Sequence, residues 1–292
     1  MKTLLTPDDV ARCCTVGLLL ELATTPKPGL VDRSSPSEQY SQFLASATAL
    51  YKHFHDAAAG RSVGDVVLNA CLDMLSWQKG GNTHLGAVLL LTPVAKAAGS
   101  CGNFNNLRRR VEEVLKKINQ AETLKIFEAV RTVSPGHLGR VAYLDVFDEK
   151  TYRRIAERRI GVLEAFKPYG RLEVVAAEYT TSYRASFIHG YKHLKNQLTQ
   201  LDLNTAGVNT FLNIMSHLPD SHVSRMFGRH AARTLSRMAR RVLDLGGLHT
   251  DRGRRAFEDM AGRVLRAGFK PAATADVLAV SYTLLLLSGW RP

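Results

Sequence analysis

The chain has 292 residues, of which 45% are hydrophobic and 22% charged, and its formal net charge is +13. This composition is typical of a folded globular protein and excludes an intrinsically disordered chain. The length suffices for a sizeable core, and no run approaches the roughly 18 consecutive apolar residues of a membrane-spanning helix.

The first predicted helix begins after Thr6, a residue type that caps helix N-termini. Pro7 suits the first helical position, and Asp8 and Asp9 favour the positive end of the helix dipole. The helix must end before Pro26, because proline lacks a backbone donor and restricts the residue before it. The segment 24–29, which holds two prolines, is therefore predicted to be a rigid loop.

Apolar residues at three- and four-residue spacing predict further helices along the chain. These cover 37–55, 63–77, 83–98, 151–166, 171–190, 204–217, 221–244, 252–267 and 274–289, with a polar amphipathic segment over 106–127 and a Pro/Gly loop over 134–139. Weak alternation leaves strands as an alternative only over 141–147 and 171–178. The sequence predicts an all-α fold, a single bundle-like domain over residues 1–292.

The N-terminus and the cysteines predict a cytoplasmic protein. Two early acids, Asp8 and Asp9, and the lack of a small-residue cleavage site argue against a signal peptide. The four cysteines form no C-x-x-C pair and are expected to be buried small hydrophobic residues in a reducing compartment: Cys13, Cys14, Cys71 and Cys101.

Several common catalytic motifs are missing from the sequence. It has no G-x-x-x-x-G-K-[ST] or G-x-G-x-x-G loop, no H-E-x-x-H and no G-x-S-x-G. His53 and His55 are two residues apart, which is poor metal-ligand spacing on a helix. These absences argue against P-loop, Rossmann, zinc-hydrolase and serine-hydrolase chemistry.

The stiff segment from Thr25 to Arg33 is the first candidate site. Lys27 and Arg33 suit phosphate oxygens, and Asp32 suits Mg²⁺ or a sugar hydroxyl. A rigid loop loses little entropy on binding. A plain helix-to-helix connection with solvated charges explains these residues equally well.

The second candidate is the Gly80–Gly86 turn before an apolar helix. Asn82 or Thr83 can cap that helix, whose free N–H groups would attract an anion, and His84 follows them. Spacing alone favours an ordinary capped and buried helix.

The third candidate begins at Asp220, a predicted N-cap, and continues into a basic helix. The stretch 221–270 holds twelve Lys and Arg against four Asp and Glu, a balance that suits phosphates. Arginines recur every four residues at Arg225, Arg229, Arg233, Arg237 and Arg241. The distal three are interpreted as a solvated face, whereas Arg225, beside the cap, is the best candidate for a phosphate contact.

The fourth candidate is Asp276, in the first turn of a very apolar helix that also contains Thr274. A carboxylate at that position needs a partner to offset its desolvation. The alternative is a carboxylate that only interacts with the helix dipole.

Together these segments resemble the triphosphoribosyl-dephospho-CoA synthase family, which makes the precursor of the citrate lyase and malonate decarboxylase prosthetic group. Segment 25–33 (TPKPGLVDR) looks nearly unaltered, and 82–86 (NTHLG) is close to the family's Asn-Thr-His-Lys-Gly. Asp220 with Arg225 and Gly228, and segment 274–279 (TADVLA), look like the family's later motifs. The order is the same over about residues 20–289.

The resemblance implies an all-helical transferase that joins the ribose C1 of ATP to the 2′-hydroxyl of 3′-dephospho-CoA and releases adenine. ATP would be the substrate and Mg²⁺ the cofactor. The catalytic residues would be Asp32, Asp276 and His84, the nucleotide-binding residues Lys27, Arg33, Asn82, Thr83, Arg225 and Thr274, and the metal ligands Asp32, Asp220 and Asp276.

Two alternatives stay open. Residues 34–40 (SSPSEQY) replace a Gly-x-His-x-Asp-Met run of typical members, and residues 271–273 (PAA) replace Pro-Gly-Gly. The chain thus looks more similar to a divergent branch in methanogens and methylotrophs, where the acceptor would belong to a tetrahydromethanopterin-type one-carbon pathway. The second alternative, a non-enzymatic nucleic-acid-binding protein, is favoured by the net charge and the arginine repeat, but disfavoured because Phe227 is the only aromatic residue between Arg225 and Arg241 that could stack on a base.

Overall fold

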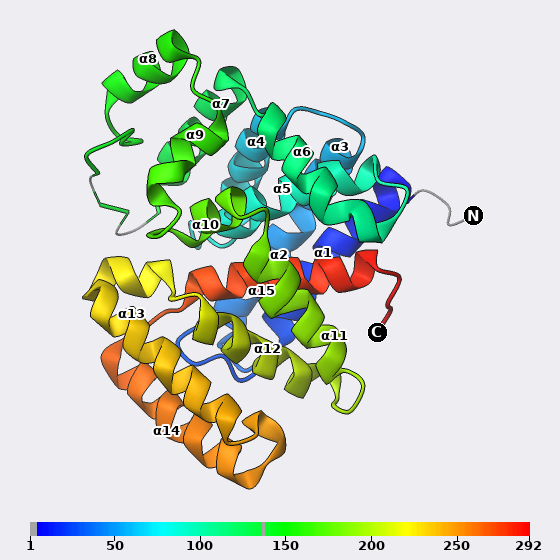
Figure 1. The fold of residues 1–292 in the computed structure, drawn as a ribbon, viewed down its shortest axis with the longest axis vertical. Helices are drawn as coiled ribbons and strands as arrows, with labels where there is room; N and C mark the ends of the chain where they lie inside the picture. The colour runs from blue at the N-terminus through cyan, green and yellow to red at the C-terminus, as the bar shows by residue number, and fades with distance from the viewer. Residues whose placement is uncertain (1–4, 136–137, 140) are drawn as a thin grey trace.

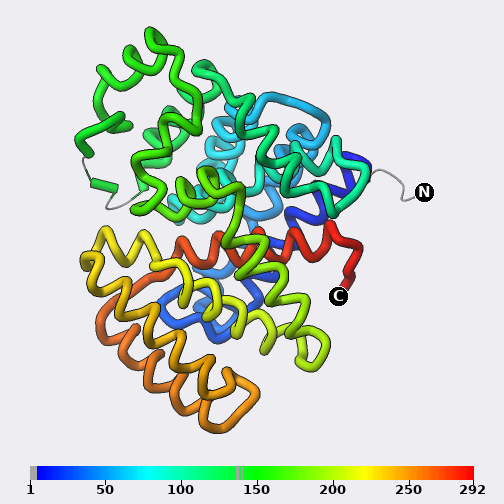
Figure 2. The backbone as a smooth tube through the Cα atoms, in the orientation of Figure 1, coloured from blue at the N-terminus to red at the C-terminus, as the bar shows by residue number. Residues whose placement is uncertain are grey.

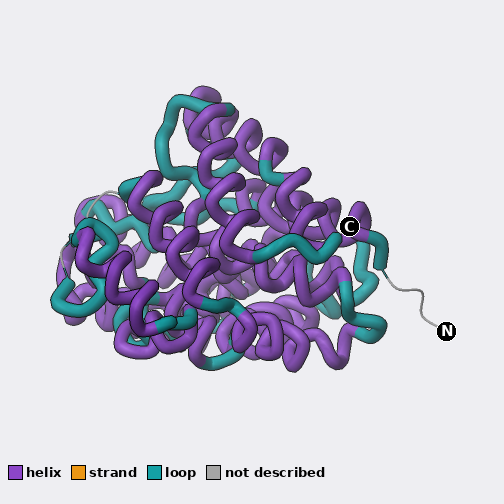
Figure 3. The backbone as a smooth tube through the Cα atoms, turned by 90° about the horizontal axis from the view of Figure 1, so that it is seen from above, coloured by secondary structure: helices purple, strands orange, loops and turns teal. Residues whose placement is uncertain are grey.

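The computed structural model describes residues 5–135, 138–139 and 141–292, and within these ranges it contains helices and loops without a strand (Figure 3). The all-α prediction is therefore confirmed. The α-helices are α1 (Pro7–Ala23), α2 (Ser37–Ala49), α3 (Tyr51–Ala58), α4 (Val63–Ser76), α5 (Leu85–Gly99), α6 (Leu107–Lys117), α7 (Gln120–Val133), α8 (Glu149–Arg158), α9 (Val162–Phe166), α10 (Val174–Thr180), α11 (His193–Gln197), α12 (Leu203–His217), α13 (Ser221–Asp244), α14 (Asp251–Ala267) and α15 (Ala272–Leu287). Three 3₁₀ turns, η1 (Phe104–Asn106), η2 (Lys167–Tyr169) and η4 (Gly247–His249), and a π-helix, η3 (Ala185–Lys192), complete the set.

The C-terminal helix α15 forms the centre of the molecule. Its residues are apolar on all sides and nearly all buried, and such a helix must be covered all round. The cover comes from α1, α5, α12 and η3. Figure 1 shows α15, in red, crossing the middle of the molecule, with α4–α9 on one side and α13 and α14 on the other. The N-terminus of α15, which carries Asp276, is thus held by helices from distant parts of the chain.

Helices α13 and α14 pack against each other as a pair, drawn in yellow and orange in Figure 2. Helix α13 is kinked at Gly228, whose φ of 85° and ψ of 160° are not helical. Glycine tolerates this conformation because it lacks a Cβ. The kink separates the first turns of α13, with Asp220 and Arg225, from the long basic remainder.

Four of the predicted elements are interrupted. The segment 37–55 is divided into α2 and α3 at Leu50, and 171–190 into α10 and η3. The segment 151–166 is divided into α8 and α9, because Arg159 ends α8 in a left-handed conformation with a φ of 53°. In 106–127, the side chain of Asn119 accepts hydrogen bonds from the backbone N–H groups of Ala121 and Glu122 and starts a new helix. Local side-chain caps can interrupt a helix although the apolar spacing continues.

The two possible strands are wrong. Helix α10 occupies most of 171–178, because tertiary packing decides the structure of short apolar segments. Segment 141–147 is an irregular loop, in which the Asp145 carboxylate accepts from the N–H groups of Val141, at 3.0 Å, and Phe147, at 2.8 Å. In the predicted loop 134–139, residues 134–135 and 138–139 are neither helix nor strand, and 136–137 lie outside the described residues.

Among the described residues, none of the helices combines the length and apolar character that crossing a membrane requires. Cys13, Cys14 and Cys71 are buried free thiols, as predicted, whereas Cys101 is partly exposed.

Candidate active site

The loop after α1 is fixed at both ends. Asn204 of α12 pairs with both backbone groups of Thr25: the Thr25 N–H donates to Oδ1 at 2.9 Å, and Nδ2 donates to the Thr25 carbonyl at 2.6 Å. At Gly29 the φ is +79°, and a Cβ there would lie 2.0 Å from the Phe269 carbonyl oxygen. Only glycine fits this close approach. The loop is thereby held between α12 and the connection from α14 to α15, as predicted for a rigid segment.

Asp32 organises this loop. Its Oδ2 accepts from Thr25 Oγ1 and from the Lys27 backbone N–H, both at 2.9 Å. Its Oδ1 accepts from the Ser34 N–H at 2.9 Å and from Ser34 Oγ at 2.6 Å. Burial would raise the pKa of Asp32, but the hydrogen bonds from Ser34, Lys27 and Thr25 outweigh it and lower that pKa. Asp32 is therefore an ionised carboxylate whose two oxygens already have four donors.

The side chain of Lys27 is buried against the end of α1. Its Nζ donates to the Glu21 carbonyl at 2.6 Å and forms an ion pair with the Glu21 carboxylate. Burial raises the pKa of Glu21, although the charge of Lys27 lowers it in part. Two of the three Lys27 protons have partners, so one remains for a phosphate oxygen.

His84, next to the start of α5, is a buried neutral hydrogen-bond donor. Ser46 Oγ accepts from Thr83 Oγ1 at 2.8 Å and lies 2.8 Å from His84 Nδ1, so the single Ser46 proton is available for Nδ1. The ring proton then resides on Nε2, a buried atom for which the described residues provide no partner. Burial and the charge of Lys27 lower the pKa of His84 to about 3. His84 therefore donates from Nε2 and is not a base at neutral pH.

We expect the His84 ring signals in NMR spectra to stay constant from about pH 5 to about pH 8, where an ordinary histidine titrates. Since the folded state disfavours its protonation, His84 contributes stability that is lost as the pH falls from 6.5 towards 3. A titration of this ring near pH 6.5 would show that its Nε2 is not enclosed as described.

Asp276 lies against the first turn of α5. A Cβ on Gly86 would lie 2.0 Å from Asp276 Oδ2, so glycine is required for the carboxylate to approach. The residue keeps partial access to solvent, but its carboxyl group is enclosed by protein atoms. This enclosure raises the pKa of Asp276 well above its usual value, Glu21 and Asp220 raise it further, and only the Ala87 N–H and Arg225 oppose the shift. Asp276 is thus a carboxylate that readily accepts a proton.

Asp220 joins the N-termini of two helices. As the N-cap of α13 it accepts from the Val223 N–H at 3.0 Å, and its other oxygen accepts from the Thr274 N–H at 2.8 Å and Thr274 Oγ1 at 2.9 Å. Burial raises the pKa of Asp220 against these hydrogen bonds. The predicted cap is confirmed, and Asp220 and Thr274 hold α13 against the first turn of α15.

Arg225 follows in the same first turns of α13. Its guanidinium forms an ion pair with Glu173, whose pKa is raised by burial and lowered in part by Arg225. The Nε atom of Arg225 is buried, and the described residues offer it no acceptor. The ion pair with Glu173 therefore holds the Arg225 guanidinium in place, and Nε is left as a donor for a ligand.

Most of the predicted site residues form one electrostatic cluster. The charge of Lys27 acts on His84, and the charges of Glu21, Asp220 and Arg225 act on Asp276. Arg33 and Asn82 are exposed, and Asn82 Oδ1 accepts from the Leu85 N–H at 3.0 Å, which caps α5 as predicted. The later arginines of α13 lie elsewhere: Arg229, Arg233, Arg237 and Arg241 are exposed.

The comparison with known proteins places the chain in a family. Residues 7–292 match the profile of CitG, the ATP:dephospho-CoA triphosphoribosyl transferases. The chain belongs to this family. The resemblance seen in the sequence motifs is therefore confirmed at the level of the enzyme family, which uses ATP and dephospho-CoA.

Individual relatives are distant but similar over nearly their whole length. A Klebsiella pneumoniae 2-(5″-triphosphoribosyl)-3′-dephosphocoenzyme-A synthase is 24% identical over 96% of this chain and 91% of its own. A Pseudomonas syringae pv. tomato protein, described as a probable synthase of this kind, is 27% identical over 94% and 89%. A solved structure from Archaeoglobus fulgidus, described as a putative triphosphoribosyl-dephospho-CoA synthase, has a TM-score of 0.67 and 26% identity, covering 85% of this chain and all of that one.

Two members of the cluster, Glu21 and Glu173, were not predicted as site residues. Glu21 shares the apolar face of α1 with Gly17 and Leu18, and a carboxylate on a buried face was the signal for it. Glu173 precedes the short helix α10, and no local pattern indicates that it meets Arg225, 52 residues later.

Proposed function

We propose that this chain transfers the triphosphoribosyl group of ATP to the 2′-hydroxyl of 3′-dephospho-CoA and releases adenine. Membership of the family supports this reaction. The observation that carries it is that a proton-accepting carboxylate, Asp276, belongs to the same cluster as two buried donors, His84 Nε2 and Arg225 Nε, for which the described residues provide no partner. Buried donors without a protein partner are rare in folded proteins, and they are used by a ligand, an ion or an ordered water.

In this reaction the bond between ribose C1′ and adenine N9 breaks, and a bond forms between C1′ and the acceptor oxygen. Asp276 takes the proton of the 2′-hydroxyl, adenine takes up one proton from solvent as it leaves, and Asp276 later returns its own proton to solvent. Protein groups must also stabilise the positive charge that develops at the ribose as the base leaves. The carboxylate of Asp276, ionised before it accepts the proton, supplies negative charge for this purpose. His84 Nε2 donates to an oxygen or ring nitrogen of the nucleotide.

The triphosphate stays on the transferred group, so it needs cations that do not take part in bond breaking. Lys27 has one free proton, and Arg225 has Nε. The predicted anion site at the beginning of α5 is already used by protein acceptors, since the Leu85 N–H donates to Asn82 and the Ala87 N–H to Asp276. Arg33, exposed at the edge of the loop, would meet the outer phosphates.

Magnesium is the part of this proposal that the protein residues support least. Two of the three predicted ligands, Asp32 and Asp220, have both oxygens occupied by hydrogen bonds. The described residues contain no group of three or more His, Cys, Asp or Glu placed to hold a metal ion. A dedicated protein site therefore does not fit, and Mg²⁺ would take its ligands mainly from ATP.

We expect removal of Mg²⁺ with EDTA to abolish adenine release while leaving the Tm of the protein without ATP unchanged. The physical reason is that Mg²⁺ would then bind through the phosphates and contribute nothing to the free energy of unfolding. A drop in Tm on chelation would show instead that the protein alone binds a metal.

Replacing Arg225 with lysine tests the phosphate contact. Arg225→Lys keeps a cation for Glu173 but removes the Nε donor, so we expect the KM for ATP to rise about tenfold at similar kcat. Arg237→Lys, an exposed position on the same helix, is the matched control and should leave KM unchanged. Equal KM values for wild type and Arg225→Lys would remove Arg225 from the nucleotide site.

A different acceptor is the second candidate. Residues 34–40, which replace the family's histidine-containing run, form the end of the loop and the start of α2. Within them, Ser34 donates a hydrogen bond to Asp32. An acceptor contact supplied by that run would be missing, whereas the nucleotide cluster would remain. Adenine release measured with dephospho-CoA and with one-carbon cofactor intermediates separates the two: release only with the latter would establish another acceptor.

A further inference from the structure

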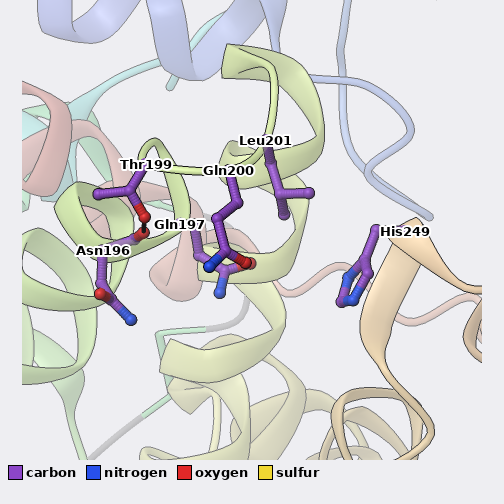
Figure 4. Close-up of a pocket in the computed structure, with 6 residues that line it drawn as sticks. All are labelled: Asn196, Gln197, Thr199, Gln200, Leu201 and His249. Atoms are coloured by element: carbon purple, nitrogen blue, oxygen red, sulfur yellow. Dashed lines mark hydrogen bonds between the residues drawn. The ribbon is translucent and has the colours of Figure 1, made fainter.

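A polar cavity lies apart from the cluster around Asp276. It has a volume of about 280 Å³ and lies between α11, α12, the C-terminal part of α13 and η4. Its lining is made of His193, Gln197, Asn209, Asn213, Arg240, Leu243, Asp244, Gly246, Gly247 and His249. A smaller pocket of about 70 Å³ adjoins it and shares Gln197 and His249; Figure 4 shows His249 on the opposite side of this pocket from the amides of Gln197 and Gln200.

The distance along α13 separates this cavity from the proposed nucleotide site. Arg240 follows Arg225 by fifteen residues on α13. The twelve residues from the kink at Gly228 to Arg240 alone correspond to roughly 18 Å at a rise of 1.5 Å per residue. One phosphate chain bound at Arg225 therefore does not occupy the cavity.

Two neutral side chains of the lining, His193 and Gln197, each keep a hydrogen-bond donor that a ligand could use. His193 Nδ1 lies 3.0 Å from the hydroxyl of Thr210, which is fully buried in α12 and has no other partner in the described residues. The hydroxyl proton is therefore used on Nδ1, and the ring proton of His193 resides on Nε2. Gln197 Oε1 accepts from Asn209 Nδ2 at 2.9 Å, which orients the amide and leaves its NH₂ group as a donor.

The third donor is a cation without a carboxylate partner. Arg240 Nη2 donates to His217 Nε2 at 3.1 Å, and His217 Nδ1 donates to the Asn213 carbonyl at 2.9 Å. His217 also stacks on His189, with ring centroids 4.0 Å apart. Within the described residues Arg240 forms no ion pair, although the exposed Asp244 lies at the edge of the cavity. The His217 ring nitrogen thus positions Arg240 through a hydrogen bond, without a carboxylate that would cancel its charge.

The helix that carries His189 and His193 is unusual. Residues 185–192 form a π-helix that continues into α11, and π-helical turns occur frequently at functional sites. Burial, the largest cause, lowers the pKa of both His189 and His193 to about 4, so both rings are neutral near pH 7. The cavity therefore combines the positive charge of Arg240 with neutral donors, a set that recognises an oxyanion, while the carboxylate of Asp244 lies exposed at its edge.

We propose that this cavity binds a small anionic ligand, the phosphate or carboxylate group of a metabolite, through Arg240, His193 Nε2–H and the Gln197 amide. The site is independent of triphosphoribosyl transfer and would be present whichever acceptor the enzyme uses.

The test is a titration of the full-length protein with inorganic phosphate at about pH 7, followed through the ring ¹⁵N signals of histidine. His193→Gln identifies the His193 signal. We expect that signal to shift and saturate with a Kd of about 1 mM, which a few charge-assisted hydrogen bonds in an open site can provide. A parallel titration with acetate shows whether phosphates or carboxylates bind better.

Arg240→Gln should weaken phosphate binding at least tenfold, because it removes the one cation of the cavity. Arg237→Gln, on the same helix but outside the lining, should bind as the wild type does. A shift that grows linearly without saturation, or an equal Kd in wild type and Arg240→Gln, would overturn the proposal.

Discussion

Asp276→Asn is expected to reduce adenine release by at least about a thousandfold and to leave the fold intact. Asparagine has the same shape and can still accept from the Ala87 N–H, but it cannot take a proton from the acceptor hydroxyl. Because the folded state raises the pKa of Asp276, its ionisation costs stability at neutral pH. The variant should therefore have a Tm equal to or above that of wild type at pH 7, and the same Tm below about pH 4.

A second variant tests the position of the carboxylate rather than its chemistry. Gly86→Ala keeps Asp276 but places a methyl group where Oδ2 now lies, 2.0 Å from the added Cβ. The carboxylate must then move, and we expect adenine release to fall about a hundredfold. Full activity of Asp276→Asn, measured as adenine formed per enzyme, would contradict the assignment of Asp276 as the base.

Asp220→Ala is expected to lower the free energy of unfolding. It removes the cap of α13 and leaves the buried N–H and hydroxyl of Thr274 without an acceptor. Loss of a cap lowers the free energy of unfolding by about 1 kcal/mol, and buried donors without an acceptor lower it further. Because the variant no longer has to desolvate the Asp220 carboxylate, part of this loss is offset, and we expect a net loss of about 2 kcal/mol. For a chain of this size the Tm should fall by about 6 °C.

The matched control is Asp202→Ala, since Asp202 caps α12 at the surface and accepts only from Asn204 and Thr205. Its loss should be about 1 kcal/mol. Thermal unfolding followed by circular dichroism measures both variants. If Asp220→Ala abolished activity at an unchanged Tm, Asp220 would belong to substrate or metal binding, as the sequence motif suggested, and not to the helix clamp.

Sequence reasoning reached the helices and most members of the cluster because both depend on local chemistry. Thr6 caps α1 in the structure, with Asp9 as its partner, and Asp220 caps α13, as the residue types predict. Asp276 stood out because a carboxylate at the start of an apolar helix needs a special environment. Each of these signals lies within a few residues of the group concerned.

The parts that sequence reasoning could not supply depend on contacts across the chain. Asp32 is an exception, because its donors Thr25, Lys27 and Ser34 lie within seven residues of it. Only the folded loop shows that they saturate its oxygens, so a metal ligand and a loop-organising residue look the same in the sequence. Whether His84 is a base or a donor depends on Ser46, which lies 38 residues earlier. The pairing of Arg225 with Glu173 has no local signature either.

The central claim is tested most directly by mass spectrometry of the products formed from ATP, Mg²⁺ and 3′-dephospho-CoA. We predict free adenine together with an adduct that retains the ribose and all three phosphates of ATP, formed by wild type and not by Asp276→Asn. ADP or AMP in place of adenine, or an adduct formed equally by Asp276→Asn, would contradict triphosphoribosyl transfer at this site.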